Sequence, residues 1–570
     1  MRLQVSKTKN AASLYVVKSI MDGKRRTSKV VERLGTEADL RKRLGGRDPY
    51  EWAAAYVAEL NRQEEEAKRE VLVKYSPVEP LNKGEQRLYN GGYLFLQKIY
   101  HELGLHTICK KIGEQQKITY DLNAVLSRLV YGRVIFPASK LATWELSKRF
   151  IEQPDFDLHH VYRTLELLNA HLDEIQAGIY RNSVKSYQRN TKVLYYDCTN
   201  FFFEIEQEDG SKQYGPSKEH KPNPIIQMGL FMDGNGIPLA FHIQPGARNE
   251  QLTLKPLEKI ILDDFKLSRF VVCTDAGLSS AENRSFNDLE DRAFITVQSI
   301  KKLRQTQREW CLEPQGWKCP GEKGRYNLGD LDVHLDRQNL YYKEMWIEEK
   351  GVRQRIIVSY SVKYREYQRQ IRKGQIERAL KAVSSDSGKL KKYGPNDFRR
   401  FVVKTHSTRD GEIADREQLG INEELIAKEE AYDGFYAVCT NLTGDVVDIL
   451  DVNKRRWEIE ECFRIMKSEF LARPVYLQRE GRIRAHFITC FIALVIYRLL
   501  EKKLNSAFTC SEIIRGLRDM NLTQIKGEGY IPAYTRNDFT DALHNAFGFR
   551  TDLQIVNTQT MKKVQKATKS

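Results

Sequence analysis

The chain has 570 residues, 41% of them hydrophobic, so it is too long for one core and should divide into several domains. Its 92 Lys and Arg against 76 Asp and Glu give a formal net charge of +16, which favours an anionic partner such as nucleic acid. The nine cysteines include no CxxC pair, and no apolar run approaches the roughly 20 residues of a membrane span. These features argue against a disulfide scaffold or a membrane protein and predict a soluble cytoplasmic protein.

The first predicted region, residues 1–82, combines a β-hairpin with a charged helix. "SLYVVKSIMDGKRRTSKVVERLG" predicts two strands around an Asp22-Gly23 turn. A helix with alternating charges follows from Pro49 to about Val71. Residues 83–190 then show apolar side chains at helical spacing, which predicts a helical domain that we expect to bind DNA.

The pattern changes to strands near Lys192. "KVLYYDCTNFFFEIE", "IIQMGLFMD", "IPLAFHIQ" and "RFVVCTDAG", with a helix before the last, predict an α/β sheet with a mixed edge in residues 191–298. Residues 299–430 are predicted to form an insertion, because buried-strand character resumes at "GFYAVCTN" and continues the sheet domain through residues 431–505. Residues 506–570 form a C-terminal region that ends in a predicted disordered basic tail, "MKKVQKATKS".

Two aspartates belong to strands that are predicted to be buried, Asp197 inside its strand and Asp275 at the end of its strand. Asp197 follows Val193–Tyr196, and a carboxylate inside such a strand is costly unless it is paired, hydrogen-bonded or bound to a cation. Asp275 ends "FVVCTD", and the carboxyl ends of strands are where open α/β sheets place their ligands. The structural alternatives are a turn cap for Asp197 and a helix N-cap for Asp275.

A third acid lies in the helical stretch "WEIEECFRIMKSEF", Trp457–Phe470. At about 100° per residue, Arg456, Glu460 and Lys467 share a narrow sector, whereas Glu461 lies about 100° further round. We therefore expect Glu460 at the boundary between core and cleft and Glu461 at the surface. The alternative is an ordinary ion pair between Arg456 and Glu460, worth about 0.2–0.5 kcal/mol. The apolar stripe beside them comprises Ile459, Phe463, Met466 and Phe470.

A polar, mostly cationic loop follows the first strand of the predicted sheet. The stretch "KEHKPNP" places Lys218, His220 and Lys221 within four positions, a set suited to contact with phosphate groups. The alternative is a solvated surface loop without a ligand.

The three acids together predict a metal site. Two aspartates on strands and one glutamate on a helix supply the hard oxygen ligands that Mg²⁺ prefers. A pair of such ions about 4 Å apart activates an attacking oxygen and stabilises the leaving one at a phosphodiester.

The sequence resembles the DDE transposases of the IS4-like superfamily of insertion sequences, most closely the IS1634-type branch, over about residues 190–500. The likeness rests on "YYDCTNFFFE" for the first aspartate and "VVCTDAGLSSAEN" for the second. For the glutamate, the family motif is Tyr, two residues, Arg, three residues, Glu, six residues, Lys, and Arg456, Glu460 and Lys467 match this spacing. The tyrosine of the motif falls on Asn453, which has neither an aromatic face nor a phenol.

The resemblance implies an α/β, RNase H-like catalytic core: a mixed five-stranded sheet with helices, interrupted by a β-rich insertion domain and preceded by a helical DNA-binding region. It implies that Asp197, Asp275 and Glu460 are catalytic and ligate two Mg²⁺ ions, for which Mn²⁺ can substitute. Water would cleave each element end, and the 3′-OH released would attack target DNA.

The resemblance also implies a homodimer that holds two terminal inverted repeats and works in the cytoplasm on nucleoid DNA. Arg456, Lys467 and the position of Asn453 would contact this DNA. Whether a hairpin intermediate frees the second strand is left open by the sequence, as are the terminal repeat and the target site.

Three other functions are compatible with parts of the pattern. An RNase H-like nuclease or resolvase would use the same acids without strand transfer. A catalytically inactive DNA-binding descendant would tolerate the change at Asn453. A glycosidase with two carboxylates would need no metal, and the net charge and the third acid disfavour it.

Overall fold

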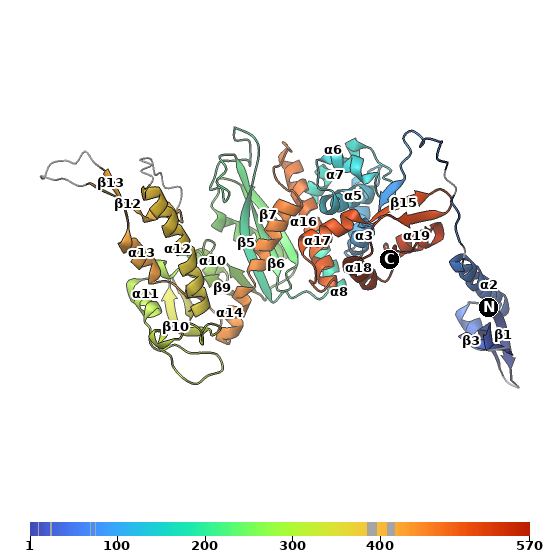
Figure 1. Ribbon diagram of the computed structural model, residues 1–570, viewed down its shortest axis with the longest axis horizontal. Helices are drawn as coiled ribbons and strands as arrows, with labels where there is room; N and C mark the ends of the chain where they lie inside the picture. Colours follow the sequence, from blue (N-terminus) through green and yellow to red (C-terminus); the bar gives the residue numbers. More distant parts are fainter. Residues whose placement is uncertain (9–10, 23–24, 69, 74–75, 385–395, 407–416) are drawn as a thin grey trace. The chain divides into compact units, whose positions relative to one another are not determined.

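The computed structural model describes residues 1–570 except 9–10, 23–24, 69, 74–75, 385–395 and 407–416, and it forms two compact units (Figure 1). The smaller unit contains residues 1–85 and 525–528. The larger unit contains residues 86–524 and 529–570.

The smaller unit is a three-stranded antiparallel sheet with two helices. Its elements are β1 (Arg2–Lys7), β2 (Ala12–Asp22), β3 (Arg25–Thr36), α1 (Glu37–Arg43) and α2 (Pro49–Lys68). Leu14 and Val16 on β2, Leu40 on α1 and Ala53 on α2 share its own buried core. The strands and the charged helix lie where the sequence predicts them, whereas the predicted turn includes Gly23, which is outside the described residues.

The larger unit is built on one mixed sheet, which confirms the α/β prediction. The strand order is β10-β11-β14-β9-β8-β5-β6-β7, with β5, β8 and β9 mutually parallel and the other neighbours antiparallel. The strands are β5 (Val193–Phe202), β6 (Ile225–Asp233), β7 (Pro238–Pro245), β8 (Val271–Thr274), β9 (Ala293–Val297), β10 (Tyr341–Glu349), β11 (Val352–Tyr360) and β14 (Phe435–Thr440).

The sheet has eight strands rather than the five expected, because β10 and β11 of the predicted insertion and β14, which follows the insertion, extend it. Ile356 and Ile357 are neighbours on β11, so their side chains point to opposite faces of the sheet, and both are fully buried. β11 is therefore covered on both faces, as an interior strand is, and it pairs with β14. The insertion is also less β-rich than expected. It contains α11 (Gln305–Leu312), α12 (Val362–Ser384) and α13 (Glu423–Glu430) beside the hairpin β12 (Val402–His406) and β13 (Glu417–Ile421).

Helices cover both faces of the sheet near β5. Tyr195 contributes to the core shared with α15 and α16, whereas its neighbour Tyr196 contributes to the core shared with α9. Because side chains alternate along a strand, Asp197 lies on the same side as Tyr195. The covering elements are α9 (Leu254–Asp263), α10 (Ala281–Phe286), α14 (Val446–Lys454), α15 (Trp457–Arg464), a π-helical turn (Ile465–Glu469) and α16 (Glu480–Lys503). Short 3₁₀ turns occur at Glu250–Thr253, Ile300–Lys302, Leu328–Asp330 and Phe398–Phe401.

The helical segment packs around α16, which lies between it and the sheet (Figure 1). Its helices are α3 (Tyr93–Glu102), α4 (Leu105–Gln116), α5 (Leu122–Ile135), α6 (Lys140–Ser147), α7 (Leu158–Ala170) and α8 (Leu172–Ser186). Of the helices described, α16 alone is long and apolar enough to cross a membrane, and 94% of its apolar window is buried inside the protein. Its apolar surface is therefore accounted for by the core.

The C-terminal residues fold back onto the helical segment, so the predicted disordered tail is wrong. Met561 and Val564 lie three residues apart on α19 and are buried in the main core, which fixes the helix despite its lysines. The elements are α17 (Cys510–Asp519), β15 (Asn521–Ile525), β16 (Gly529–Pro532), α18 (Asp538–Phe547), β17 (Val556–Asn557) and α19 (Thr558–Ala567), and β4 (Leu88–Asn90) pairs with β15.

Candidate functional site

The strand register brings Asp197 and Asp275 side by side. β5 and β8 are parallel with Tyr195 opposite Cys273, and each aspartate lies two residues further along. Neighbouring strands are about 4.8 Å apart, and residues two positions apart share a face. Both aspartates therefore lie just past the last paired residues of β5 and β8. Asp275 directly follows the end of β8, whereas Asp197 lies inside β5 and pairs with Leu230 on β6.

Burial and the second aspartate make Asp197 an unusual acid. The residue is only 8% exposed. Burial, above all, and the neighbouring charge of Asp275 raise the pKa of Asp197 to about 6, although Lys218 and Arg456 act in the opposite direction. The protein alone therefore supplies too little positive charge to hold this carboxylate at its ordinary pKa.

Arg456 links all three predicted acids. Its guanidinium lies 2.9 Å from Glu460 Oε1. Burial works against its charge, but Glu460, Asp197 and Asp275 outweigh burial and raise the pKa of Arg456. Arg456 thus pairs directly with Glu460 and lies within electrostatic reach of Asp197 and Asp275.

The structure does not show the structural alternatives for the two aspartates: Asp197 lies inside β5 rather than at a strand end, and Ser280 rather than Asp275 is the N-cap of α10. Asp197 Oδ1 accepts a hydrogen bond from the Cys198 N–H at 2.7 Å, and Asp275 Oδ1 accepts one from the Leu278 N–H at 3.0 Å. The pair between Arg456 and Glu460 is the expected i,i+4 ion pair. Each of these hydrogen bonds engages one carboxylate oxygen, so these local contacts and a role in ligand binding are compatible.

The expectation that Glu461 is the surface acid is wrong. Glu461 is 26% exposed and pairs with Arg464 at 2.5 Å, whereas Glu460 is 54% exposed. The reason is that Arg464, one turn further along α15, covers Glu461 and leaves Glu460 open. The four residues of the predicted apolar stripe are buried as expected.

Two lysines flank Asp197 from different elements. Lys218 Nζ donates to the Cys198 carbonyl oxygen and lies 3.7 Å from Glu250. Burial opposes its charge, but Asp197 and Glu250 raise the pKa of Lys218. Lys467 lies on the π-helical turn, where burial and then Lys218 lower its pKa to about 8 against the pull of Asp197.

Glu219 is a site residue that the sequence analysis missed. Its carboxylate lies 3.0 Å from Lys467 Nζ and also pairs with Arg473. The only sequence signal for Glu219 is that it is an acid within a cationic loop, and this signal does not predict Lys467 or Arg473 as its partners. His220 and Lys221 are exposed in the same loop, and their backbone N–H groups donate to Ser217. The contacts described for these two residues do not bring their side chains to the acids.

Asn453 is buried, and its side chain makes hydrogen bonds within the protein. It is 6% exposed, and its Nδ2 donates to the hydroxyl of Tyr436 at 3.1 Å. Both residues line a pocket of about 470 Å³ together with Arg456 and Glu460. A phenol is therefore present in the pocket even though the position of the family's tyrosine holds an asparagine.

Asn453→Tyr is expected to destabilise the protein by about 1–3 kcal/mol, because a larger ring overpacks a buried position and removes the partner of Tyr436. Urea unfolding of the two proteins measures this difference. Lys454→Tyr, at an adjacent side chain that is 61% exposed, serves as the control. Equal stability of Asn453→Tyr and wild type would show that the position is not tightly packed.

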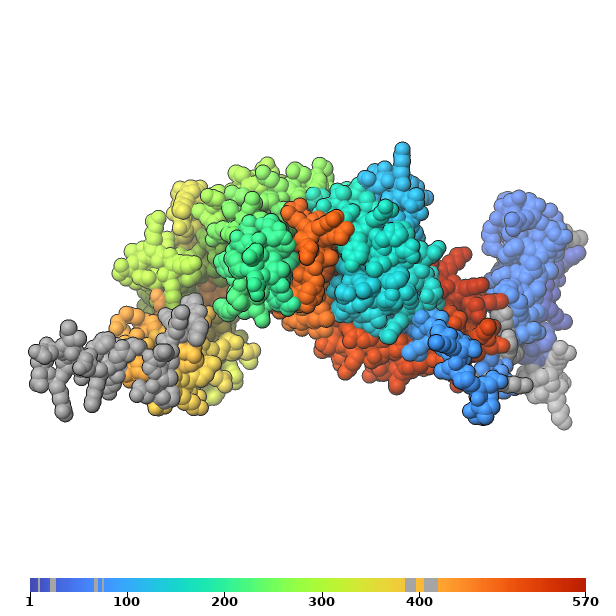
Figure 2. Space-filling model, turned by 90° about the horizontal axis from the view of Figure 1, so that it is seen from above, coloured from blue at the N-terminus to red at the C-terminus, as the bar shows by residue number. Residues whose placement is uncertain are grey.

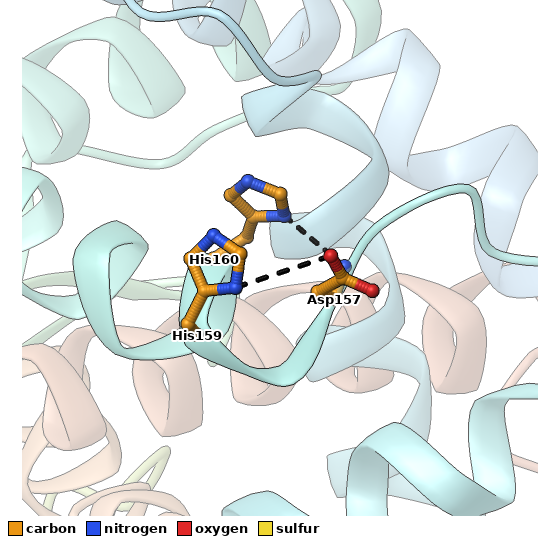
Figure 3. A group of neighbouring side chains, drawn as sticks. All are labelled: Asp157, His159 and His160. Carbon is orange, nitrogen blue, oxygen red and sulfur yellow. Dashed lines mark hydrogen bonds and ion pairs between the residues drawn. The ribbon is translucent and has the colours of Figure 1, made fainter.

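Asp157, His159 and His160 form another acid and histidine group (Figure 3). The Asp157 N–H donates to His160 Nδ1 at 3.1 Å in the capping box of α7, and His159 Nδ1 is 4.0 Å from Asp157 Oδ2. The side chains of Asp157 and His159 are 76% and 60% exposed. The capping role accounts for this group without a metal.

Comparison with known proteins identifies one family. A family model described as "Transposase DDE domain" matches residues 190–496, more than half of the chain, and the range contains Asp197, Asp275 and Glu460. Of the curated proteins, none matches the sequence. A solved synaptic complex of piggyBac transposase with hairpin DNA is 8% identical, with 89% of this chain and 80% of that chain covered and a TM-score of 0.35. A paired-end complex of Mos1 transposase with the left transposon end is 13% identical, with 41% and 65% covered and a TM-score of 0.13.

Proposed function

Because this chain belongs to the family of transposases with a DDE domain, we propose that it cleaves the ends of an insertion sequence and joins them to target DNA. The observation that carries the proposal is the adjacency of Asp197 and Asp275 on parallel strands, with Glu460 paired to Arg456, whose charge is within electrostatic reach of both aspartates. These are the acids that we propose to be catalytic.

We assign the core of the larger unit to the RNase H-like type. The strands β7-β6-β5-β8-β9 support this assignment, because β5 pairs antiparallel with β6 and parallel with β8. We further place the chain in the IS4-like superfamily, in its IS1634-type branch. The spacing of Arg456, Glu460 and Lys467 supports that placement, and Asn453 departs from it.

The acids fit two divalent cations, with Mg²⁺ as the ion we propose and Mn²⁺ as a substitute. Asp197 and Asp275 provide hard oxygen donors, and the raised pKa of Asp197 is the property expected of a carboxylate that lacks a cation partner. Bound ions of this kind activate the attacking oxygen of an in-line displacement and stabilise the leaving oxygen. Glu460 is exposed enough to turn from Arg456 toward such ions.

The cations of the site are suited to hold the DNA strand. Lys218 and Lys467 lie within electrostatic reach of Asp197 and would bind the phosphates next to the one that is cut. Arg456 would contact a phosphate oxygen once Glu460 has turned away from it. In the first reaction, the oxygen of water bonds to phosphorus and the bond to the 3′ oxygen breaks, which leaves a 3′-OH. In the second, the oxygen of that 3′-OH bonds to a phosphorus of the target, and the bond from that phosphorus to the target's own 3′ oxygen breaks, which leaves a 3′-OH on the target.

The proposal includes partners beyond the site. Two terminal inverted repeats must be cut in concert, so we propose a homodimer with the helical segment 83–190 and the basic termini on the repeats. Such a complex would act on nucleoid DNA in the cytoplasm. The net charge of +16 supports an interaction with DNA phosphates.

Cleavage of a labelled duplex tests the proposal. The duplex carries the element's end, taken from the DNA that flanks the coding region. We expect wild type to cut it with Mg²⁺ or Mn²⁺ and not with Ca²⁺, and Asp275→Asn to lose at least about a thousandfold in rate, since metal ligands supply several kcal/mol. Asp291→Asn, at an exposed aspartate paired with Arg269, is the matched control. Cutting that needs no metal, or that survives in Asp275→Asn, would contradict the assignment.

A further inference from the structure

A second pocket lies between the helical segment and the chain that follows the glutamate helix. Its volume is about 420 Å³. It is lined by the start of α6, by the segment Leu471–Leu477 before α16, and by Arg133, Tyr162 and His486. In Figure 2 the orange chain near residue 480 lies against the cyan helices on this face of the larger unit.

The buried polar groups of this pocket are cationic or neutral. Arg133 is 4% exposed, Lys140 is 6% exposed and His486 is 7% exposed. Of the described residues that line the pocket, none is an aspartate or a glutamate. An uncompensated buried cation is costly, so this composition is unusual for a pocket without a ligand.

Lys140 shows this lack of an anion most clearly. Its ammonium group lies 3.5 Å from His486 Nδ1, and His486 Nε2 lies 3.1 Å from the Ala472 carbonyl oxygen. Since a carbonyl only accepts, Nε2 carries the proton and Nδ1 accepts from Lys140. Burial and then Arg133 lower the pKa of Lys140 to about 7, and the groups that act on it include no carboxylate. A bound anion would restore its charge.

Two other features of the pocket favour an anion. Ser139, Lys140 and Leu141 form the N-terminus of α6, where backbone N–H groups and the helix dipole attract negative charge. Two nitrogens of the Arg133 guanidinium donate hydrogen bonds to the carbonyl oxygens of Phe470 and Ala138. The third nitrogen, Nε, is buried and has no hydrogen-bond partner among the described residues.

The mouth of the pocket is apolar and exposed. Tyr476 is 73% exposed, Leu471 is 52% exposed and Leu141 is 50% exposed. A cationic floor below an aromatic and aliphatic rim matches the two halves of a nucleotide, because phosphate pairs with cations and a base stacks on an aromatic ring.

Ion pairs connect the pocket with the acids. Arg473 lines the pocket and pairs with Glu219, which also binds Lys467, and Lys467 is within electrostatic reach of Asp197. A strand that lies at the acids and continues past Lys467 therefore reaches the pocket along Lys467, Glu219 and Arg473, a group in which two cations share one carboxylate.

We propose that this pocket binds one nucleotide of a DNA strand, with a backbone phosphate at Lys140 and Arg133 and the base against Tyr476. The proposal rests on the proposed function for its source of DNA. The pocket would hold the strand at a second point, away from the scissile phosphate, and so fix its path across the acids.

Lys140→Met tests the phosphate contact. Binding of a single-stranded oligonucleotide and of the element-end duplex is measured over a range of salt concentrations, with Ca²⁺ in place of Mg²⁺. We expect binding about tenfold weaker, as for loss of a charge-assisted hydrogen bond, and a salt slope smaller by about 0.7–0.9. The folded state should be retained, because methionine fills the same space without a buried charge. Lys428→Met, at an exposed lysine paired with Glu424, is the matched control.

Tyr476→Ala tests the base contact at an exposed side chain that the fold does not need. We expect about a tenfold loss for the single strand, since stacking on an aromatic ring is worth about 1–3 kcal/mol per base. Inorganic phosphate alone is the third probe. Wild-type affinity and salt slope in both variants would overturn the proposal, as would a Lys140-dependent site for inorganic phosphate that leaves DNA binding unaffected. Asp275→Asn is expected to lose cleavage while the binding effects of Lys140→Met and Tyr476→Ala remain. Failure of the proposed cleavage and failure of the proposed pocket would therefore give different results.

Discussion

Glu460→Gln is expected to lower metal-dependent cleavage by at least about a thousandfold, whereas Glu461→Gln on the same helix should stay within about twofold of wild type. The two glutamates are adjacent in sequence and differ in environment. Glu460 is 54% exposed and pairs with Arg456, whose pKa is also raised by Asp197 and Asp275. Glu461, in contrast, is covered by Arg464. Glutamine keeps the size and loses the charge that a divalent cation needs.

Single-turnover cleavage of the labelled element end measures both variants at saturating protein. Binding of the same duplex in Ca²⁺ should change little in either variant, because the loss is one of chemistry. Equal rates for Glu460→Gln and wild type would remove Glu460 from the catalytic set, and a large loss in Glu461→Gln would exchange the two roles.

Asp197→Asn is expected to make the metal-free protein more stable while it abolishes cleavage. The folded-state pKa of about 6 lies above the ordinary value of 3.8, so the folded protein binds the proton more tightly than the unfolded chain. Stability of the metal-free wild type therefore falls as the pH rises from about 4 through 6, and the full cost of about 3 kcal/mol is present at pH 7. Asparagine carries no charge and avoids this cost.

Thermal unfolding with a chelator, at several pH values, measures this difference. The advantage of Asp197→Asn should be largest at pH 7 and should vanish near pH 4. Mg²⁺ should then raise the unfolding midpoint of wild type and leave that of the variant unchanged. Asp451→Asn, at an aspartate that is 58% exposed, should show neither effect. An Asp197→Asn protein that is less stable than wild type at pH 7 would indicate a structural carboxylate.

The strands that carry the two aspartates could be predicted from sequence because their signals are local. β5 is a run of buried apolar and aromatic residues interrupted by one acid, and the glycine turn between β6 and β7 defines a hairpin. The adjacency of Asp197 and Asp275 follows once the two strands are parallel neighbours. The pairing of β5 with β8 depends on contacts between distant parts of the chain. The sequence therefore indicated that the two aspartates share an edge of the sheet, but it did not give the register of the two strands.

The rest depended on long-range contacts that a local pattern does not contain. β11 joins the main sheet through β14, about 80 residues away, so the expected insertion extends the sheet. The lysines of the C-terminal segment suggested disorder, yet Met561 and Val564 fix it against the core. The sequence did not single out Lys140, because its neighbours Arg133 and His486 come together with it only through tertiary packing.

Sequencing of joined DNA is the measurement that tests the central claim most directly. Wild-type protein, the element-end duplex and a supercoiled plasmid are incubated with Mg²⁺, and junctions between them are recovered. The account predicts junctions in which the 3′ end of the element is linked to plasmid DNA, with none in Asp275→Asn. Free 3′-OH ends that accumulate without junctions would indicate a nuclease, and bound but uncut duplex would indicate a DNA-binding protein without catalysis.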